Sequence, residues 1–240
     1  MIMIRLNDIT LSHGSLRLFD GCSLEIATGA CTALVGRNGS GKSTLLKAIC
    51  GNLRPQKGTI EIAGKDVSLL KPAELARLVA MVSTERVRVA NLRCVDVVAM
   101  GRAPYTNWMG RLQPADYEKV TDALRQVNMT GYVERTMDKM SDGECQRIMI
   151  ARALAQETPI MLLDEPTSFL DVPGRRQIAD LLASLAGGMG KTILYSTHEI
   201  DLAVKNCTQV ILIDGGKVQS LDPKNAKERE RIDSVFRLPL

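Results

Sequence analysis

Apolar and polar positions alternate along the N-terminal part of the chain, over residues 4–6, 9–11, 16–18 and 24–26. A period of two is typical of strands with one buried face, and the polar run at 13–15 predicts a turn between two of them. The hydrophobic pattern therefore predicts a β-rich N-terminal region.

Four later runs are short and almost wholly apolar, at residues 31–35, 160–163, 192–195 and 210–213. Such runs are typical of parallel strands that are covered on both faces. Helical stretches, such as 43–50 and 175–185, lie between them. This alternation predicts an α/β sheet with right-handed crossover connections.

The pattern changes between residues 85 and 156, where 95–100, 116–127 and 144–155 have helical spacing and no convincing strand occurs. We therefore expect a helical subdomain at 85–156, inserted into an α/β core made of 1–84 and 157–240. The charged run at 224–231 predicts a solvated terminal helix.

Length, charge and cysteine content narrow the class of protein. The chain of 240 residues is long enough for one domain with an insertion, and its net charge of +4 is too small to indicate a nucleic-acid partner. No apolar run is long enough for a membrane span or a signal peptide. Six cysteines without a C-x-x-C pair, and only two histidines, favour reduced thiols in a cytosolic protein over a metal site.

A glycine-rich segment between the apolar strand at 31–35 and the following helix fits the pattern G-x-x-x-x-G-K-[ST]. It comprises Gly36, Arg37, Asn38, Gly39, Ser40, Gly41, Lys42, Ser43 and Thr44. Glycines let successive backbone N–H groups turn toward one anion, and the helix N-terminus adds partial positive charge. We expect Lys42 to reach the β- and γ-phosphates of a nucleotide and Ser43 to offer its hydroxyl to magnesium.

Two carboxylates, Asp164 and Glu165, follow the apolar run at 160–163. The carboxyl edge of a parallel sheet is where ligands bind. Asp164 is placed to hold magnesium through a water, and Glu165 to polarise the water that attacks the γ-phosphate. Taken alone, the pair could be two solvated loop acids, but the phosphate loop favours the catalytic interpretation.

The sequence Ser141, Asp142, Gly143, Glu144 precedes the last helix of the predicted insertion. It can be a capping box with Ser141 as N-cap and Glu144 at the third position. It can also be a second anion site at a helix N-terminus. One chain offers no obvious second phosphate for that site.

These motifs, in this order, resemble those of the ATP-binding cassette ATPases over nearly the whole chain. Residues 36–44 resemble the Walker A loop, 140–144 the signature motif, 160–165 the Walker B strand, 168–171 with Asp171 the D-loop, and His198 the switch histidine. The resemblance implies a P-loop NTPase core with an N-terminal antiparallel β subdomain and an inserted helical subdomain. It also implies ATP and Mg²⁺ as the groups bound.

The resemblance further implies a homodimer in which two ATP molecules are buried at one interface. The signature residues Ser141, Asp142, Gly143 and Glu144 of one copy then contact the ATP of the other. His198 is implied to bind the γ-phosphate and hold the attacking water, with Lys42 and Glu165 as the other catalytic residues. A lone histidine at a strand end is otherwise more often structural.

The chain departs from the family pattern at three places. Thr84 stands where the Q-loop glutamine is expected, so Glu85 becomes a candidate oxygen ligand. Asp142 replaces the first glycine of the signature, and we expect it to cap its helix locally and face solvent. His13 occupies the position of the aromatic residue that stacks on adenine.

Residues 96–105 and 141–152 are most similar to ATPase subunits of importers for iron-siderophore, haem and cobalamin. Such subunits lie at the cytoplasmic face of the inner (plasma) membrane, dock on an integral-membrane permease and act indirectly with a substrate-binding protein. They take no nucleic-acid partner. Tyr105 and Trp108 follow this motif, and each can pack internally or against the permease.

Three functions fit the sequence. The first is a transport ATPase, and the second is a soluble cassette ATPase outside transport, such as an iron–sulfur assembly-type factor. The third is a nucleotide-binding subunit with little hydrolysis, motivated by Thr84 and Asp142. The presence of Lys42, Asp164, Glu165 and His198 argues against the third, and the lack of a coiled coil or a tandem cassette argues against most examples of the second.

Overall fold

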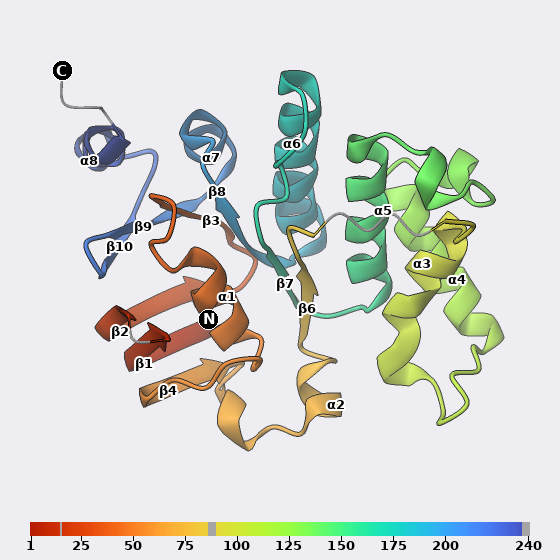
Figure 1. The fold of residues 1–240 in the computed structure, drawn as a ribbon, viewed down its shortest axis with the longest axis horizontal. Helices are drawn as coiled ribbons and strands as arrows, with labels where there is room; N and C mark the ends of the chain where they lie inside the picture. The colour runs from red at the N-terminus through yellow and green to blue at the C-terminus, as the bar shows by residue number, and fades with distance from the viewer. Residues whose placement is uncertain (15, 86–89, 237–240) are drawn as a thin grey trace.

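The protein consists of two sheets surrounded by helices, as Figure 1 shows. The structure is a computed structural model that describes residues 1–14, 16–85 and 90–236. Within these residues, no helix combines the length and the apolar composition needed to cross a membrane.

In the described part of the chain, the smaller sheet is antiparallel and has four strands, in the order β2 (Leu16–Ala27), β1 (Ile2–His13), β4 (Lys57–Ile62) and β5 (Lys65–Asp66). The β-rich N-terminal region is confirmed, but its four predicted segments form two long strands. The pairing of β1 with β2 shifts between Leu6 and Ile9, where Asp8 has a φ of 50°. This irregularity interrupts the alternation, so the sequence pattern divides each strand in two.

Among the residues that the structure describes, the larger sheet has six strands in the order β10 (Lys217–Leu221), β9 (Gln209–Asp214), β3 (Cys31–Gly36), β8 (Thr192–Thr197), β7 (Ile160–Leu163) and β6 (Val79–Val82). All pairs are parallel except β10 with β9. Consequently β3, β7 and β8 end at one edge. This edge places the glycine-rich loop, the two carboxylates and His198 near one another.

Both faces of the larger sheet are covered. Ala33 and Val35 of β3 belong to one hydrophobic cluster, and Leu34 between them belongs to another. The first cluster includes residues of α6 (Val172–Met189) and α7 (Ile200–Asn206), and the second includes residues of α1 (Lys42–Ile49) and the small sheet. Burial on both sides explains why the strand is apolar throughout.

The helical region lies beside the β6 edge of the larger sheet (Figure 1). It contains α3 (Cys94–Ala99), η2 (Met100–Tyr105), α4 (Pro114–Gln126), η3 (Thr130–Tyr132), η4 (Met137–Lys139) and α5 (Asp142–Ala155). The three helices predicted here are confirmed, and so is the fold class of an α/β core with an inserted helical subdomain.

The remaining helices lie outside this region. Two short helices, η1 (Val67–Leu69) and α2 (Pro72–Leu75), lead from β5 to β6. The terminal helix α8 spans Ala226–Phe236. The charged run 224–231 is exposed apart from the half-buried Glu228, as predicted, and the next residue, Ile232, is buried in the main hydrophobic cluster.

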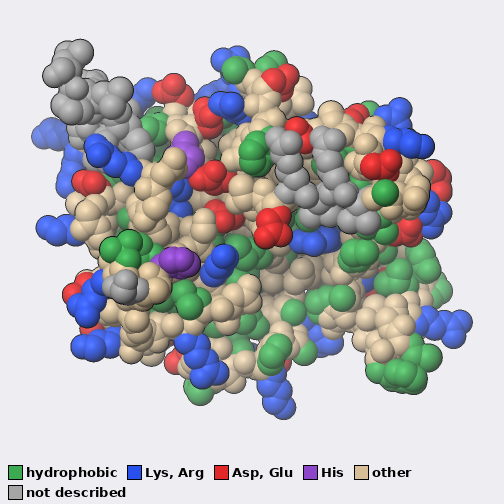
Figure 2. Space-filling model, in the orientation of Figure 1, with side chains coloured by type: hydrophobic (Ala, Val, Ile, Leu, Met, Phe, Trp, Pro, Cys, Tyr) green, Lys and Arg blue, Asp and Glu red, His purple; other side chains and the backbone are tan. Residues whose placement is uncertain are grey.

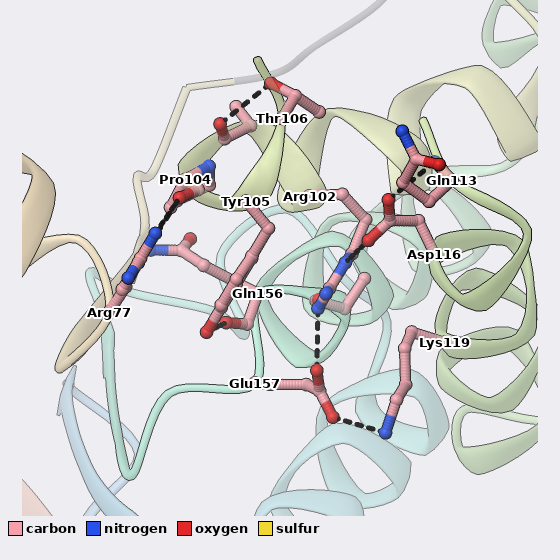
Figure 3. Close-up of polar contacts among 12 residues, drawn as sticks. Arg77, Arg102, Pro104, Tyr105, Thr106, Gln113, Asp116, Lys119, Gln156 and Glu157 are labelled. Carbon is pink, nitrogen blue, oxygen red and sulfur yellow. Dashed lines mark hydrogen bonds and ion pairs between the residues drawn. The ribbon is translucent and has the colours of Figure 1, made fainter. Parts of the chain in front are cut away.

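A buried ionic network joins the helical region to the core around Arg102 (Figure 3). The Arg102 guanidinium donates to Asp116 Oδ1 at 2.8 Å, to the carbonyl of Ala155 at 2.7 Å and to Glu157 Oε2 at 2.8 Å. It also lies over the ring of Tyr105, at 4.1 Å from the ring centre. The backbone N–H of Gln113, the N-cap of α4, contributes most to lowering the pKa of Asp116, and Arg102 adds to this effect.

Candidate functional site

The glycine-rich loop wraps around the end of the Lys42 side chain. Lys42 Nζ donates to the carbonyls of Gly36 at 2.9 Å and Arg37 at 3.3 Å. Gly41 has a φ of 100°, and a Cβ there would lie 2.7 Å from the Phe19 ring. Only glycine fits this conformation in this space. The loop between β3 and α1 thus has the local geometry expected of a phosphate-binding loop.

Two buried polar groups of the loop have hydrogen-bonding capacity left for a ligand, since the Lys42 ammonium has three N–H groups and donates to two carbonyls. Ser40 Oγ is buried and has no hydrogen-bond partner within the described residues. Burial lowers the pKa of Lys42, while the charges of Glu165 and Asp164 work in the opposite direction. An oxygen-rich anion can satisfy both groups, since buried polar atoms are normally hydrogen-bonded.

Asp164 accepts hydrogen bonds from two hydroxyl groups, one in the first turn of α1 and one in β8. Ser43 donates to Asp164 Oδ1 at 3.0 Å, and Ser196 donates to the same oxygen at 2.7 Å. Carboxylate and hydroxyl oxygens are the ligands that Mg²⁺ takes in nucleotide sites, so Ser43 and Asp164 have the right chemistry to hold it.

Ser196 also orients the second carboxylate, because it accepts a hydrogen bond from the Glu165 backbone N–H at 2.8 Å. Sequence reasoning missed Ser196. The available signal was a small polar residue near the carboxyl end of a buried parallel strand, two positions before His198.

The Glu165 carboxylate contacts a side chain at each of its oxygens. Its Oε1 lies 2.6 Å from His198 Nε2, and its Oε2 accepts from Ser168 Oγ at 3.0 Å. The backbone of Glu165 has a φ of 47°, a strained value for a residue other than glycine. Such strain is common at functional sites, and here it lies where the strand turns into the following loop.

One cavity of about 320 Å³ brings the phosphate loop and Glu165 together. His13 lines the same cavity, although its predicted stacking on adenine stays a prediction. Both histidines of the chain lie on one face of the molecule, on either side of several acidic side chains (Figure 2). This face therefore carries both imidazoles, and His13 lies there beside the phosphate loop and Glu165.

The signature residues lie at the N-terminus of α5 and form a capping box. Ser141 Oγ accepts from the Glu144 N–H at 3.3 Å, and Glu144 Oε2 accepts from the Ser141 N–H at 2.8 Å. The helix is thus capped by Ser141 rather than by Asp142. Asp142 is half-buried at the first helical position, so the expectation that it faces solvent is wrong.

A second cavity, of about 400 Å³, lies between this helix end and the D-loop. It is lined by signature residues including Ser141 and Gly143 and by D-loop residues 169–171. Asp171 Oδ1 accepts from the Gly174 N–H at 2.9 Å and so caps α6. Of the described residues, none lines both this cavity and the one at the phosphate loop.

Thr84, at the position where the family pattern has a glutamine, lies next to Asp164. Its hydroxyl donates to the Asp164 carbonyl at 3.0 Å, which ties the end of β6 to the end of β7. Glu85 is exposed. Their contact with a metal or with water stays a prediction, and residues 86–89 lie outside the described part of the chain.

A phosphate loop after β3, a histidine after the neighbouring strand β8 and two carboxylates after the next strand, β7, define a nucleotide-hydrolysing P-loop protein. Comparison with known protein families narrows this class, because the profile described as ABC transporter matches residues 19–168. The chain belongs to the ABC transporter family. The predicted family and the predicted ATPase class are thereby confirmed.

Individual relatives agree with this assignment. An uncharacterised ABC transporter ATP-binding protein of Methanocaldococcus jannaschii is 40% identical over 237 residues, which cover 98% of this chain and 82% of that protein. The petrobactin import ATP-binding protein FpuC of Bacillus anthracis is 35% identical over 90% of this chain and 80% of its own length. The ATP-binding cassette MJ0796, solved as a dimer in a post-hydrolysis state with ADP and Pi, superposes with a TM-score of 0.78. It is 26% identical, over 93% of this chain and 100% of that one.

Proposed function

We propose that this chain is the ATP-hydrolysing subunit of an importer for an iron-siderophore, haem or cobalamin. The observation that best supports ATP hydrolysis is the contact between Glu165 and His198, because Glu165 also lines the phosphate-loop cavity. Relatives named for import, such as FpuC, favour transport over a soluble cassette function.

In this proposal, ATP binds with its phosphates in the glycine-rich loop, where Lys42 and the backbone N–H groups hold the β- and γ-phosphates. Ser43 and Asp164 are the residues that hold Mg²⁺, which when bound neutralises charge on the phosphate oxygens. Glu165 accepts a proton from water as the water oxygen attacks the γ-phosphorus and the bond to ADP breaks. His198 keeps the Glu165 carboxylate oriented toward that water.

The partner that completes the site is a second copy of this chain. The separation of the signature cavity from the phosphate-loop cavity supports this pairing. Within one chain, the signature residues do not line the cavity in which the phosphates would bind. The related cassette MJ0796 was solved as a dimer. The signature of each copy then covers the ATP held by the other.

A membrane permease is the second proposed partner, with a substrate-binding protein acting through it at the other side of the membrane. Trp108 and Met109 support this docking, because their side chains are 92% and 60% exposed. Figure 2 shows apolar side chains gathered over the segment between η2 and α4. Tyr105 instead packs internally, between Arg102 and Arg77. The chain is then peripheral, at the cytoplasmic face of the membrane.

Phosphate release from ATP tests the catalytic part of the proposal, with the purified chain alone and with its permease. The substitution Glu165→Gln removes the general base, so the rate should fall about 10²–10⁴-fold. Glu118→Gln, at an exposed position on α4, is the matched control and should leave the rate unchanged. A wild-type rate in Glu165→Gln would remove Glu165 from this role.

A further inference from the structure

Arg175, in the first turn of α6, connects two loops that are far apart in the sequence. Its Nε donates to the carbonyl of Leu170 at 2.8 Å, and its guanidinium forms an ion pair with Glu199. Leu170 belongs to the D-loop and Glu199 directly follows His198. One side chain thus reaches both the segment after Glu165 and the segment that carries the histidine.

Each of these two anchor points has a fixed place in the fold. The Leu170 side chain is buried in the main hydrophobic cluster, and the next residue, Asp171, caps α6. Glu199 is the N-cap residue of α7, and its backbone N–H donates to Thr197 Oγ1 at 3.0 Å. Arg175 therefore ties together the starts of two helices at the carboxyl edge of the sheet.

Helix stability does not explain a cation at this position. The N-terminus of a helix carries partial positive charge, so an arginine in the first turn is electrostatically unfavourable there. The guanidinium is instead directed at acceptors outside the helix, and its planar fork can serve two acceptors at once. A lysine, with a single charged nitrogen, lacks that fork.

The position of His198 depends on these contacts. The side chains of His198 and Glu165 are 39% and 27% exposed, so packing alone does not confine them. The ring reaches Glu165 Oε1 from the strand end immediately before Glu199. A shift of the 198–199 backbone would therefore change the distance between the ring and the carboxylate.

We propose that Arg175 is a positioning residue for ATP hydrolysis. It fixes the distance between the D-loop and the segment 198–199, and it thereby keeps His198 in contact with Glu165. This inference rests on the proposed function, because it assigns a role to Arg175 in that reaction. Arg175 touches neither nucleotide nor water and acts only through His198 and the D-loop.

Steady-state ATP hydrolysis by Arg175→Gln tests the role, with Arg176→Gln as the matched control at the exposed neighbouring position. A misplaced catalytic group typically costs up to about 10²-fold, so we expect kcat to fall about 10- to 100-fold. The KM for ATP should stay within about twofold, because the phosphate loop is untouched. Arg176→Gln should behave as wild type.

Two further variants separate positioning from general stability. Arg175→Lys keeps the charge but cannot serve both acceptors, so it should restore only part of kcat. The exchange Arg175→Glu with Glu199→Arg restores the ion pair without the Leu170 contact and should also recover part of the loss. Wild-type kcat in Arg175→Gln, or a loss that matches its unfolded fraction by circular dichroism, would overturn the proposal.

A spectroscopic measurement keeps the inference testable even if the wild-type chain does not hydrolyse ATP. The chain has two histidines, so ¹⁵N-histidine labelling gives ring signals from His198 and from His13 alone. Arg175→Gln should shift the His198 ring signals and leave those of His13 in place. Unchanged His198 signals would overturn the proposal, whereas an inactive wild-type chain would count against the proposed function.

Discussion

At the scale of single residues, the site is organised by small hydroxyl side chains as much as by its charged groups. Ser196 is fully buried and contacts both the Asp164 carboxylate and the Glu165 backbone N–H. It therefore sets the orientation of the residues to which we assign Mg²⁺ binding and proton transfer. A hydroxyl at this position contributes through geometry, since it carries no charge.

Ser196→Ala should weaken both folding and hydrolysis. It leaves a buried N–H without its acceptor, which costs about 1–3 kcal/mol in the free energy of unfolding. Urea denaturation measures this loss, and kcat should fall because Asp164 and Glu165 lose a shared anchor. Ser184→Ala is the control, since its hydroxyl donates to the Leu181 carbonyl within its own helix, α6. Equal stability and equal kcat in the two variants would contradict this role for Ser196.

At the scale of elements, α5 links the signature to the junction with the core. Its N-terminus carries the Ser141 capping box, and the carbonyl of Ala155 at its C-terminus accepts from Arg102. A positive charge at a helix C-terminus is favourable for the helix dipole. Gly101 also lets η2 approach α5 closely, because a Cβ there would lie 2.1 Å from the Arg152 carbonyl. The helix is thus held at the end opposite to the signature.

Arg102→Met should destabilise the fold strongly, because it leaves the buried Asp116 carboxylate without its charged partner. Breaking a buried ion pair typically costs about 3–5 kcal/mol, which chemical denaturation measures as a drop in the free energy of unfolding. The control is Arg125→Met on α4, where the pair with Asp122 is exposed and contributes less than about 1 kcal/mol. Similar losses in both variants would contradict a buried, structural role for Arg102.

Strong local patterns made much of this arrangement predictable. The parallel strands other than β6 were found because burial on two faces makes their runs almost wholly apolar, and the three helices because their spacing is regular. β6 (Val79–Val82) was missed although it is as short and as apolar as β7, so its signal was present in the sequence. The roles of Ser196 and Arg175 depend on contacts between distant segments, which spacing along a single chain does not reveal.

At the scale of the whole molecule, the two halves of the proposed site lie in different cavities. The phosphate loop and Glu165 line one, and the signature with the D-loop lines the other. In the function that we propose, a chain built in this way is incomplete alone, and two copies facing each other supply what each lacks. Nucleotide binding and self-association should therefore be thermodynamically linked, because ATP favours the closed pair over separate chains.

The most direct test of this central claim is the mass of Glu165→Gln in solution, measured by analytical ultracentrifugation with and without Mg-ATP. Because this variant hydrolyses ATP slowly, ATP stays at the interface. We therefore expect a monomer without nucleotide and a dimer at saturating Mg-ATP. Adding Lys42→Ala to the same variant removes the ammonium group that we assign to the phosphates and should keep the protein monomeric. A Glu165→Gln protein that binds Mg-ATP yet stays monomeric would contradict the proposed link between ATP binding and dimer formation.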